Sequence, residues 1–150
     1  MRLRNLDRAA KRAKVAYRWD DAARLRALGE LCYLAARIES VDAIDPLRIL
    51  VEDESATGLV APGEDLRLRA LRALVGLLGA APDSTAYRCR HALIAALTAP
   101  RLAVSALIGL VGLWPGEADD FLRRLPPTAA GQDLLNIGID MAFPKKFAQQ

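Results

Sequence analysis

Few side chains in this sequence have the types and spacing that catalysis requires. His91 is the only histidine, so neither a histidine pair nor a histidine-rich metal site can form within one chain. It lies one helical turn from Arg88, where it is either an exposed helix histidine or a general base. No serine stands in a nucleophile-elbow pattern, and no glycine-rich loop ends in Lys-Ser or Lys-Thr. The sequence therefore predicts a protein that is not an enzyme and uses no cofactor.

The cysteines and acidic clusters also lack the pattern of a metal site. Cys32 and Cys89 have neither metal-ligand nor redox spacing, and each falls on an apolar helical face. We expect two buried free thiols, with a disulfide as the alternative. The acidic clusters at residues 20–21, 52–54 and 119–120 fall at expected helix ends or in a loop. Carboxylates there complement the helix dipole or remain solvated, so no metal ligands are predicted.

Basic residues gather at the start of the chain. The first 18 residues hold seven basic residues and one acidic residue, a net charge of +6, whereas the rest of the chain carries −3. A helix over residues 3–18 would place apolar residues on one stripe and these cations on the opposite face. The face comprises Arg4, Arg8, Lys11, Arg12, Lys14 and Arg18. It is a solvated face of a capping helix, a contact for nucleic-acid phosphates, or a contact for an acidic protein surface.

The composition indicates an all-α protein of one domain, residues 1–150. Hydrophobic residues make up 53% of the chain and aromatic residues only 5%, and Ala and Leu, the best helix formers, dominate. The longest apolar run, residues 102–114, is shorter than the roughly 20 residues of a membrane-spanning helix. The charges that recur through residue 18 leave no room for a signal-peptide core. We therefore expect a cytoplasmic protein with no membrane span.

Apolar spacing, capping residues and prolines divide the chain into expected helices. They span about residues 3–18, 20–39, 41–53, 64–80, 84–98, 100–113, 117–125 and 128–143. Residues 54–63, rich in Ser, Thr, Gly and Pro, are the one clear loop.

A heptapeptide that begins with Ala-Leu recurs four times within these helices. It reads ALGELCY at Ala27–Tyr33, ALVGLLG at Ala73–Gly79, ALIAALT at Ala92–Thr98 and ALIGLVG at Ala106–Gly112. Such recurrence is typical of repeat architectures, in which each unit buries its apolar face against the next. Glycines inside these helices each cost about 1 kcal/mol relative to alanine. We expect close approach of a neighbouring helix to offset that cost, unless Gly79 and Gly112 simply mark helix ends.

The chain resembles the short bacterial type of HEAT repeat. The first-helix pattern of that family is similar to Asp21–Leu31 (DAARLRALGEL) and Asp65–Gly79 (DLRLRALRALVGLLG), and its second-helix pattern is similar to Ala43–Val51 (AIDPLRILV). The resemblance implies a right-handed α-solenoid of about three antiparallel helix pairs, at residues 20–53, 64–98 and 100–125. A basic helix at 1–19 and a second helix at 126–143 would cap the stack, before a tail at 144–150. The third pair departs from the pattern because it lacks the acidic cap and its second helix is short.

The resemblance also implies a function in binding other macromolecules. In that family second helices line the concave surface, which would here carry a ridge of Arg48, Arg88, His91, Arg123 and Arg124, suited to carboxylate or phosphate groups. We expect a non-catalytic scaffold or adaptor that binds a protein partner through this ridge and loop 54–63. A homo-oligomer would cover apolar end faces. The alternatives are a nucleic-acid-binding accessory protein that uses the basic first helix, and arginines engaged in intramolecular salt bridges.

Overall fold

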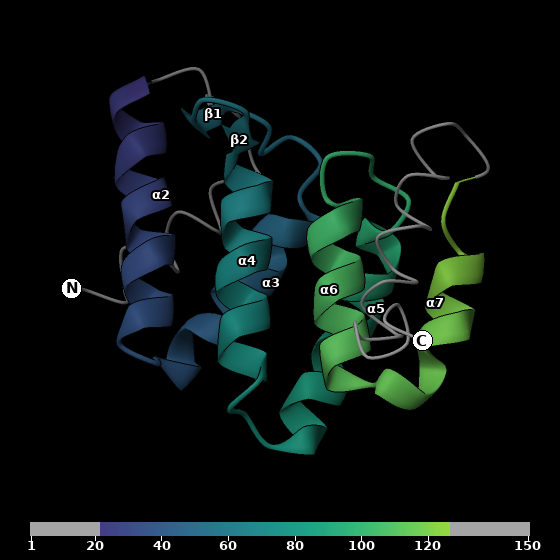
Figure 1. The fold of residues 1–150 in the computed structure, drawn as a ribbon. Coiled ribbons are helices and arrows are strands. Elements are labelled where there is room, and N and C mark those ends of the chain that lie inside the picture. The colour runs from purple at the N-terminus through teal and green to yellow at the C-terminus, as the bar shows by residue number, and fades with distance from the viewer. Residues whose placement is uncertain (1–21, 127–150) are drawn as a thin grey trace, which may run out of the picture. The chain divides into compact units, whose positions relative to one another are not determined.

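The computed structural model describes residues 22–126, and their contacts divide the chain into two compact units after Ala86. In the first unit, helices α2 and α3 both pack against α4, and a small hairpin of β1 and β2 precedes α4 (Figure 1). The elements are α2 (Ala22–Arg37), a 3₁₀ turn η1 (Val41–Ala43), α3 (Ile44–Glu52), β1 (Leu59–Ala61), β2 (Glu64–Asp65) and α4 (Leu66–Leu78). The buried core of this unit includes Leu28, Cys32, Ala35, Leu47, Leu50, Leu71, Leu74 and Leu78.

Helix α2 ends in a Schellman motif that is built without glycine. Ser40 N donates to Ala35 O and Glu39 N donates to Ala36 O, each at 3.1 Å, which satisfies carbonyls that the helix itself leaves open. Glu39 occupies the left-handed position of the motif with φ of 52°, a conformation that is unfavourable for a residue with a Cβ atom. The turn directs the chain at once into η1 and α3.

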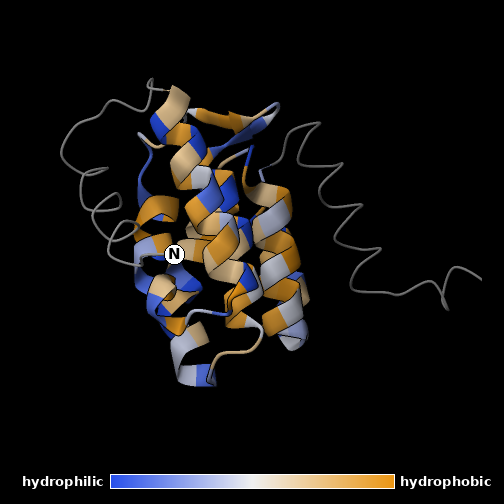
Figure 2. Ribbon diagram, turned by 90° about the vertical axis from the view of Figure 1, so that its left-hand side faces the viewer, coloured by the Kyte–Doolittle hydropathy of each residue, from blue (hydrophilic) through white to orange (hydrophobic). Residues whose placement is uncertain are grey.

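The hairpin between α3 and α4 is the one β element in residues 22–126. Its strands are antiparallel, with Ala61 opposite Glu64 and Leu59 opposite Asp65, and an irregularity falls at Val60. The two-residue connection is Pro62–Gly63, and Gly63 has φ of 73°, the conformation that the second central residue of a type II turn requires. Figure 2, coloured by hydropathy, shows β1 as an apolar segment at one end of the helices.

The hairpin leads directly into the start of α4. Asp65 closes β2 and is also the N-cap residue of the helix, where its side chain accepts a hydrogen bond from Leu68 N at 2.8 Å. The backbone of the following turn pairs with the loop, because Leu66 N donates to Gly58 O and Arg67 N donates to Ala56 O. One short segment therefore fixes both the strand and the first turn of α4.

The second unit contains the remaining described helices. Helix α5 (Asp83–Ala96) begins in the first unit and continues into the second, where α6, η2 and α7 pack together. Their bounds are α6 (Ala103–Leu113), η2 (Pro115–Glu117) and α7 (Ala118–Arg123). Arg90 of α5 forms two hydrogen bonds with Glu117, and its guanidinium carbon lies 4.8 Å from the ring centre of Trp114 and 5.3 Å from that of Phe121. This stacked, bidentate arginine joins α5 to η2 and α7.

The all-α class predicted from composition is confirmed for the described residues, with the hairpin as an addition. Segment 54–63, expected as a plain loop, contains β1. The glycine expectation holds only in part: a Cβ atom on Gly29 would meet Val60 of β1 at 2.9 Å, whereas Cβ atoms on Gly76 and Gly112 would meet nothing within 4 Å. The close neighbour of Gly29 is thus a strand, and within residues 22–126 no helix comes that close to Gly76 or Gly112. The solenoid and single-domain predictions stay predictions.

The terminal helices expected at 1–19 and 126–143 and the tail lie outside the described residues, apart from Pro126. Between Ala22 and Pro126, no helix combines the length and the apolar character that crossing a membrane requires.

Candidate functional site

An open pocket of about 420 Å³ lies between α2 and α4 in the first unit. Helix α2 contributes one wall, α4 contributes the opposite wall, and β2 adds Glu64 near the start of α4. The lining residues are Glu30, Tyr33, Ala36, Glu64, Arg69, Arg72 and Ala73. The pocket therefore combines small apolar side chains and one aromatic ring with two carboxylates and two guanidinium groups.

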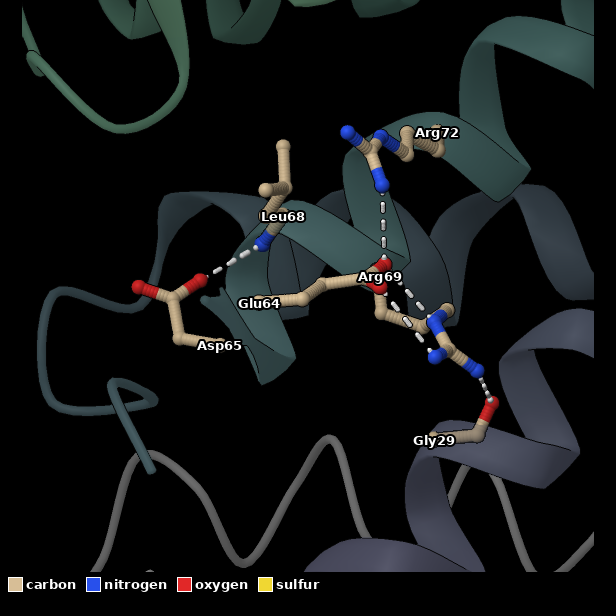
Figure 3. A network of polar contacts seen from close by, with 6 residues as sticks. All are labelled: Gly29, Glu64, Asp65, Leu68, Arg69 and Arg72. Carbon is tan, nitrogen blue, oxygen red and sulfur yellow. Dashed lines mark hydrogen bonds and ion pairs between the residues drawn. The ribbon is translucent and has the colours of Figure 1, made fainter. Parts of the chain in front are cut away.

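A bidentate ion pair of two lining residues, Arg69 and Glu64, forms part of the pocket wall, and Figure 3 shows its contacts. Arg69 donates from Nε to Glu64 Oε1 at 2.7 Å and from Nη2 to Glu64 Oε2 at 3.2 Å. Arg72 Nη1 also contacts Glu64 Oε1, at 3.3 Å. Both partners of the Arg69 pair are largely buried, whereas 57% of the Arg72 side chain is exposed. Arg69 therefore anchors Glu64, and Arg72 reaches the same carboxylate from the solvent side.

The pair is held in its charged form. The hydrogen bond from Arg69 keeps the pKa of Glu64 below its ordinary value, against the opposing effect of burial, and the charges of both arginines add to the lowering. The same hydrogen bond raises the pKa of Arg69, to which the charge of Glu30 also contributes. Since both Glu64 oxygens accept from Arg69, this carboxylate is poorly placed to act as a free base.

Two neighbouring contacts position the pair. Asp65 caps α4 and so fixes Glu64, the residue before it, beside the first turns of the helix. On the other side, Arg69 Nη1 extends toward the carbonyl oxygen of Gly29 in α2, a long hydrogen bond of 3.5 Å. Gly29 is buried and touches Val60, so hairpin, α2 and α4 meet at the pocket.

Near the pocket, α2 and the segment that leads from it into η1 expose large apolar side chains. Tyr33 lines the pocket and its ring carries Arg37, whose Nη1 lies 3.3 Å from the Tyr33 hydroxyl and whose guanidinium carbon lies 5.6 Å from the ring centre. Farther along the chain, Ile38 and Val41 have exposed fractions of 58% and 62%. We call this set the α2 apolar strip; it consists of Tyr33, Leu34, Ile38 and Val41.

Burial raises the pKa of Cys32, the one thiol of α2. Cys32 is fully buried, and loss of hydration raises the pKa of its thiol to about 12, although the charge of Arg69 acts in the opposite direction. Cys89 in α5 is likewise buried, and neither cysteine forms a disulfide, as the sequence predicted. Over residues 22–126, no cluster of three or more His, Cys, Asp or Glu residues has an arrangement that could hold a metal ion.

Arg48, the ridge residue expected in the first unit, is engaged with carboxylates of its own helix. Its Nη1 donates to Glu52 Oε1 at 2.9 Å, and its Nε lies 3.7 Å from Asp45 Oδ1. These contacts match the intramolecular salt bridges considered as an alternative for the predicted ridge.

The other four ridge residues belong to the second unit. Arg88 and His91 are exposed on α5, one helical turn apart. Arg123 lies 3.8 Å from Asp120 in α7, and the adjacent Arg124 is exposed at the end of that helix. The ridge as a common surface stays a prediction, and so does the role of the basic face at residues 4–18, which lies outside the described part of the chain.

The pocket was not predicted from the sequence. Glu64, Arg69 and Arg72 stand in or next to the segment that carries the HEAT resemblance, where they were read only as part of a repeat pattern. One signal was available: Arg69 and Arg72 are three residues apart, so they share a face of an amphipathic helix. The partners on α2 lie about 40 residues away, and no local spacing connects them.

No known protein family, curated protein or solved structure matches this chain. The assignment of a function therefore depends on the geometry of the pocket and of the α2 apolar strip.

Proposed function

We propose that this protein is a non-catalytic interaction module, a scaffold or adaptor, and that a protein partner binds the first unit along α2. The partner segment presents aliphatic side chains to the α2 apolar strip and a carboxylate to the adjoining pocket. A HEAT-like right-handed solenoid, in which α2–α3, α4–α5 and α6–α7 are successive pairs, is the architecture proposed to display this face. The single observation that carries the proposal is that Tyr33, which lines the charged pocket, and three further large apolar side chains are exposed within nine residues of the chain.

The exposure of the strip supports this choice. Four large apolar side chains fall within nine residues, and two of them, Ile38 and Val41, are more than half exposed. Single exposed apolar residues are common on protein surfaces, but apolar residues that gather at one place mark interaction sites. Tyrosine is also among the residues enriched in protein interfaces, because its ring is apolar and its hydroxyl bonds to polar groups.

The charges around the strip favour a partner segment with an acidic group. Arg37 lies over the exposed Tyr33 ring, and Arg72 lies in the pocket that the same ring lines. The predicted arginine ridge offers a second surface for carboxylates. However, Arg48 and Arg123 already pair with acidic residues of their own helices. The strip and pocket are therefore the better supported site.

The test compares two exposed isoleucines. The full chain is purified from its native host after nuclease treatment, the retained protein is identified, and binding is measured with the two purified components. We expect Ile38→Ser to weaken that binding by about tenfold or more, the effect of losing one well-packed apolar contact. Ile108→Ser is the matched control, because Ile108 is an exposed isoleucine in the second unit.

Equal binding by both variants would contradict the proposal. If nuclease removes everything that was retained, the nucleic-acid alternative replaces it, and binding should then fall steeply with salt. If light scattering shows instead that Ile38→Ser dissociates an oligomer of the chain, the strip is a contact between copies. Loss of partner binding in Arg48→Glu and Arg123→Glu, with Ile38→Ser unaffected, would move the site to the predicted ridge.

A further inference from the structure

We infer that the pocket between α2 and α4 binds a peptide carboxylate that lies beside an aliphatic side chain, and that Arg72 is the residue that receives the carboxylate. The inference deepens the proposed function and rests on it for one point, that the natural ligand is part of a protein. The ligand chemistry itself follows from the pocket.

Arg69 and Arg72 differ in how far their donors are already used. Arg69 directs Nε and Nη2 to Glu64 and Nη1 to the carbonyl of Gly29, so all three of its nitrogens face groups of the protein. Arg72 contacts Glu64 through Nη1 alone, at the longer distance of 3.3 Å, and over half of its side chain is exposed. In Figure 3 the rest of its guanidinium points away from Glu64. That edge is able to donate two parallel hydrogen bonds to a second carboxylate.

The charge of Glu64 compensates Arg72 only in part, because Arg69 and Arg72 share this one carboxylate. Glu64 gives both oxygens to Arg69, and the hydrogen bond from Arg69 is the largest cause of the lowered pKa of Glu64. A carboxylate on the outer edge of Arg72 would therefore complete an alternating row of carboxylate and guanidinium groups. Glu30, exposed on the opposite wall, opposes such a ligand through its negative charge. Removing the Glu30 charge should consequently strengthen binding.

The remaining walls fit an aliphatic group. Ala36 and Ala73 have short side chains, so they leave space, and the Tyr33 ring adds an apolar surface. The volume of about 420 Å³ falls within the range of about 300–1,000 Å³ that is common for small-ligand sites. A leucine at a peptide C-terminus brings the carboxylate and the aliphatic group together, and so does an aspartate next to a leucine.

Three short peptides distinguish these sources in a titration of the ¹⁵N-labelled full chain. Acetyl-Ala-Leu carries a C-terminal carboxylate, acetyl-Asp-Leu-amide carries only a side-chain carboxylate, and acetyl-Ala-Leu-amide carries none. The signals followed are the Nε–Hε groups of Arg69 and Arg72 and the amides of Ala36 and Ala73. We expect one or both acidic peptides to shift these signals in a saturable manner, and the uncharged peptide to shift them far less.

Three variants then test the assigned roles. Arg72→Gln should weaken the binding of the acidic peptide by about tenfold or more, as expected for the loss of a charge-assisted hydrogen bond. Arg101→Gln, an exposed arginine outside the pocket, should leave the affinity within about twofold. Glu30→Gln should strengthen binding by about twofold or more, because a charge of the same sign as the ligand is removed. Arg72 and Glu30 are both exposed, so the two variants are expected to fold, which circular dichroism checks.

Equal shifts with all three peptides, or equal affinities of Arg72→Gln and Arg101→Gln, would overturn the inference. The proposed function fails separately. If Ile38→Ser abolishes binding of the partner while no acidic peptide binds, the strip stands and the pocket assignment is wrong. If the peptides bind but Ile38→Ser leaves the partner unaffected, the pocket stands and the strip is wrong.

Discussion

Replacing Gly29 by alanine tests the packing of β1 on α2. A Cβ atom at this position would lie 2.9 Å from Val60 Cβ and 3.1 Å from Val60 Cγ1. Because Val60 Cβ is bonded directly to the backbone, the clash cannot be relieved by rotating the side chain, and the strand itself must move. Such overpacking costs about 1–3 kcal/mol, while the gain in helix propensity offsets about 1 kcal/mol. We expect a net destabilisation of about 1 kcal/mol.

Gly76→Ala is the matched control, since Gly76 is also a helix-interior glycine but its added Cβ atom would meet nothing within 4 Å. Here the propensity gain acts alone, so we expect a stabilisation of about 0.5–1 kcal/mol. Urea unfolding, followed by far-ultraviolet circular dichroism, measures both variants through their midpoints at constant slope. The two midpoints should move in opposite directions. A shift of the same sign and size in both would refute the close contact between Val60 and Gly29.

The remaining predictions concern single residues of the first unit. Glu39→Gly should stabilise the fold by about 0.5–1 kcal/mol in urea unfolding, because glycine tolerates the positive φ at this position; an unchanged midpoint would contradict it. Asp65→Ala should cost about 1 kcal/mol and Asp65→Asn less, because only the alanine removes the capping oxygen; equal losses would argue against the cap. Cys32 should resist a thiol reagent at pH 8 until urea unfolds the chain, because its pKa of about 12 keeps the thiol protonated and burial excludes the reagent. Glu64→Gln should destabilise the fold by about 1–2 kcal/mol at pH 7. The pKa of Glu64 is lowered on folding, so its charged form contributes stability above the unfolded-state pKa of about 4.3. That stability is lost as the pH falls through the folded pKa, and unfolding curves of wild type and variant from pH 7 to 3 should converge. A difference that stays constant over this range would show that charge is not the cause.

Helical periodicity predicted the described helices well because their buried faces are long. The second residue of each recurring heptapeptide is a leucine, and all four are buried: Leu28, Leu74, Leu93 and Leu107. The four helices that hold them, α2, α4, α5 and α6, are each longer than two turns, which is enough for the apolar residues to show a period near 3.6. The ends were less exact: α4 was expected over 64–80 and spans Leu66–Leu78. The helix starts two residues later than expected because Glu64 and Asp65 form β2, which pairs with β1.

The hairpin escaped sequence analysis because its strands are too short to show alternation. Three residues of β1 and two of β2 cannot display a period of two. Pro62 and Gly63 were recognised as turn residues, but proline and glycine occur both in plain loops and in two-residue hairpin connections. What forms the strands is tertiary structure: Ala56 is fully buried, and the carbonyl oxygens of Ala56 and Gly58 accept hydrogen bonds from the backbone at the start of α4.

The pocket was unpredictable for a related reason. Its walls come from α2 and α4, whose lining residues nearest in sequence, Ala36 and Arg69, are separated by α3 and the hairpin. Local spacing reports which residues share a helix face, but it does not report which face of another helix lies opposite. The expected ridge had the same weakness, because it combined arginines from different helices by analogy with a family. Arg48 instead pairs with the residues four after and three before it.

Gly29 connects the stability of the hairpin to the chemistry of the pocket. On one side it admits Val60, which holds β1 and, through the two-residue turn, Glu64 at the end of the hairpin. On the other side its carbonyl faces Arg69, the anchor of Glu64. A side chain at position 29 should therefore do more than destabilise: by moving the strand it should move Glu64 relative to Arg72. Gly29→Ala is thus expected to alter the affinity for an acidic peptide as well as the unfolding midpoint, whereas Gly76→Ala should alter the midpoint alone. If both glycine variants bind the peptide like wild type, the hairpin supports the fold but does not position the site.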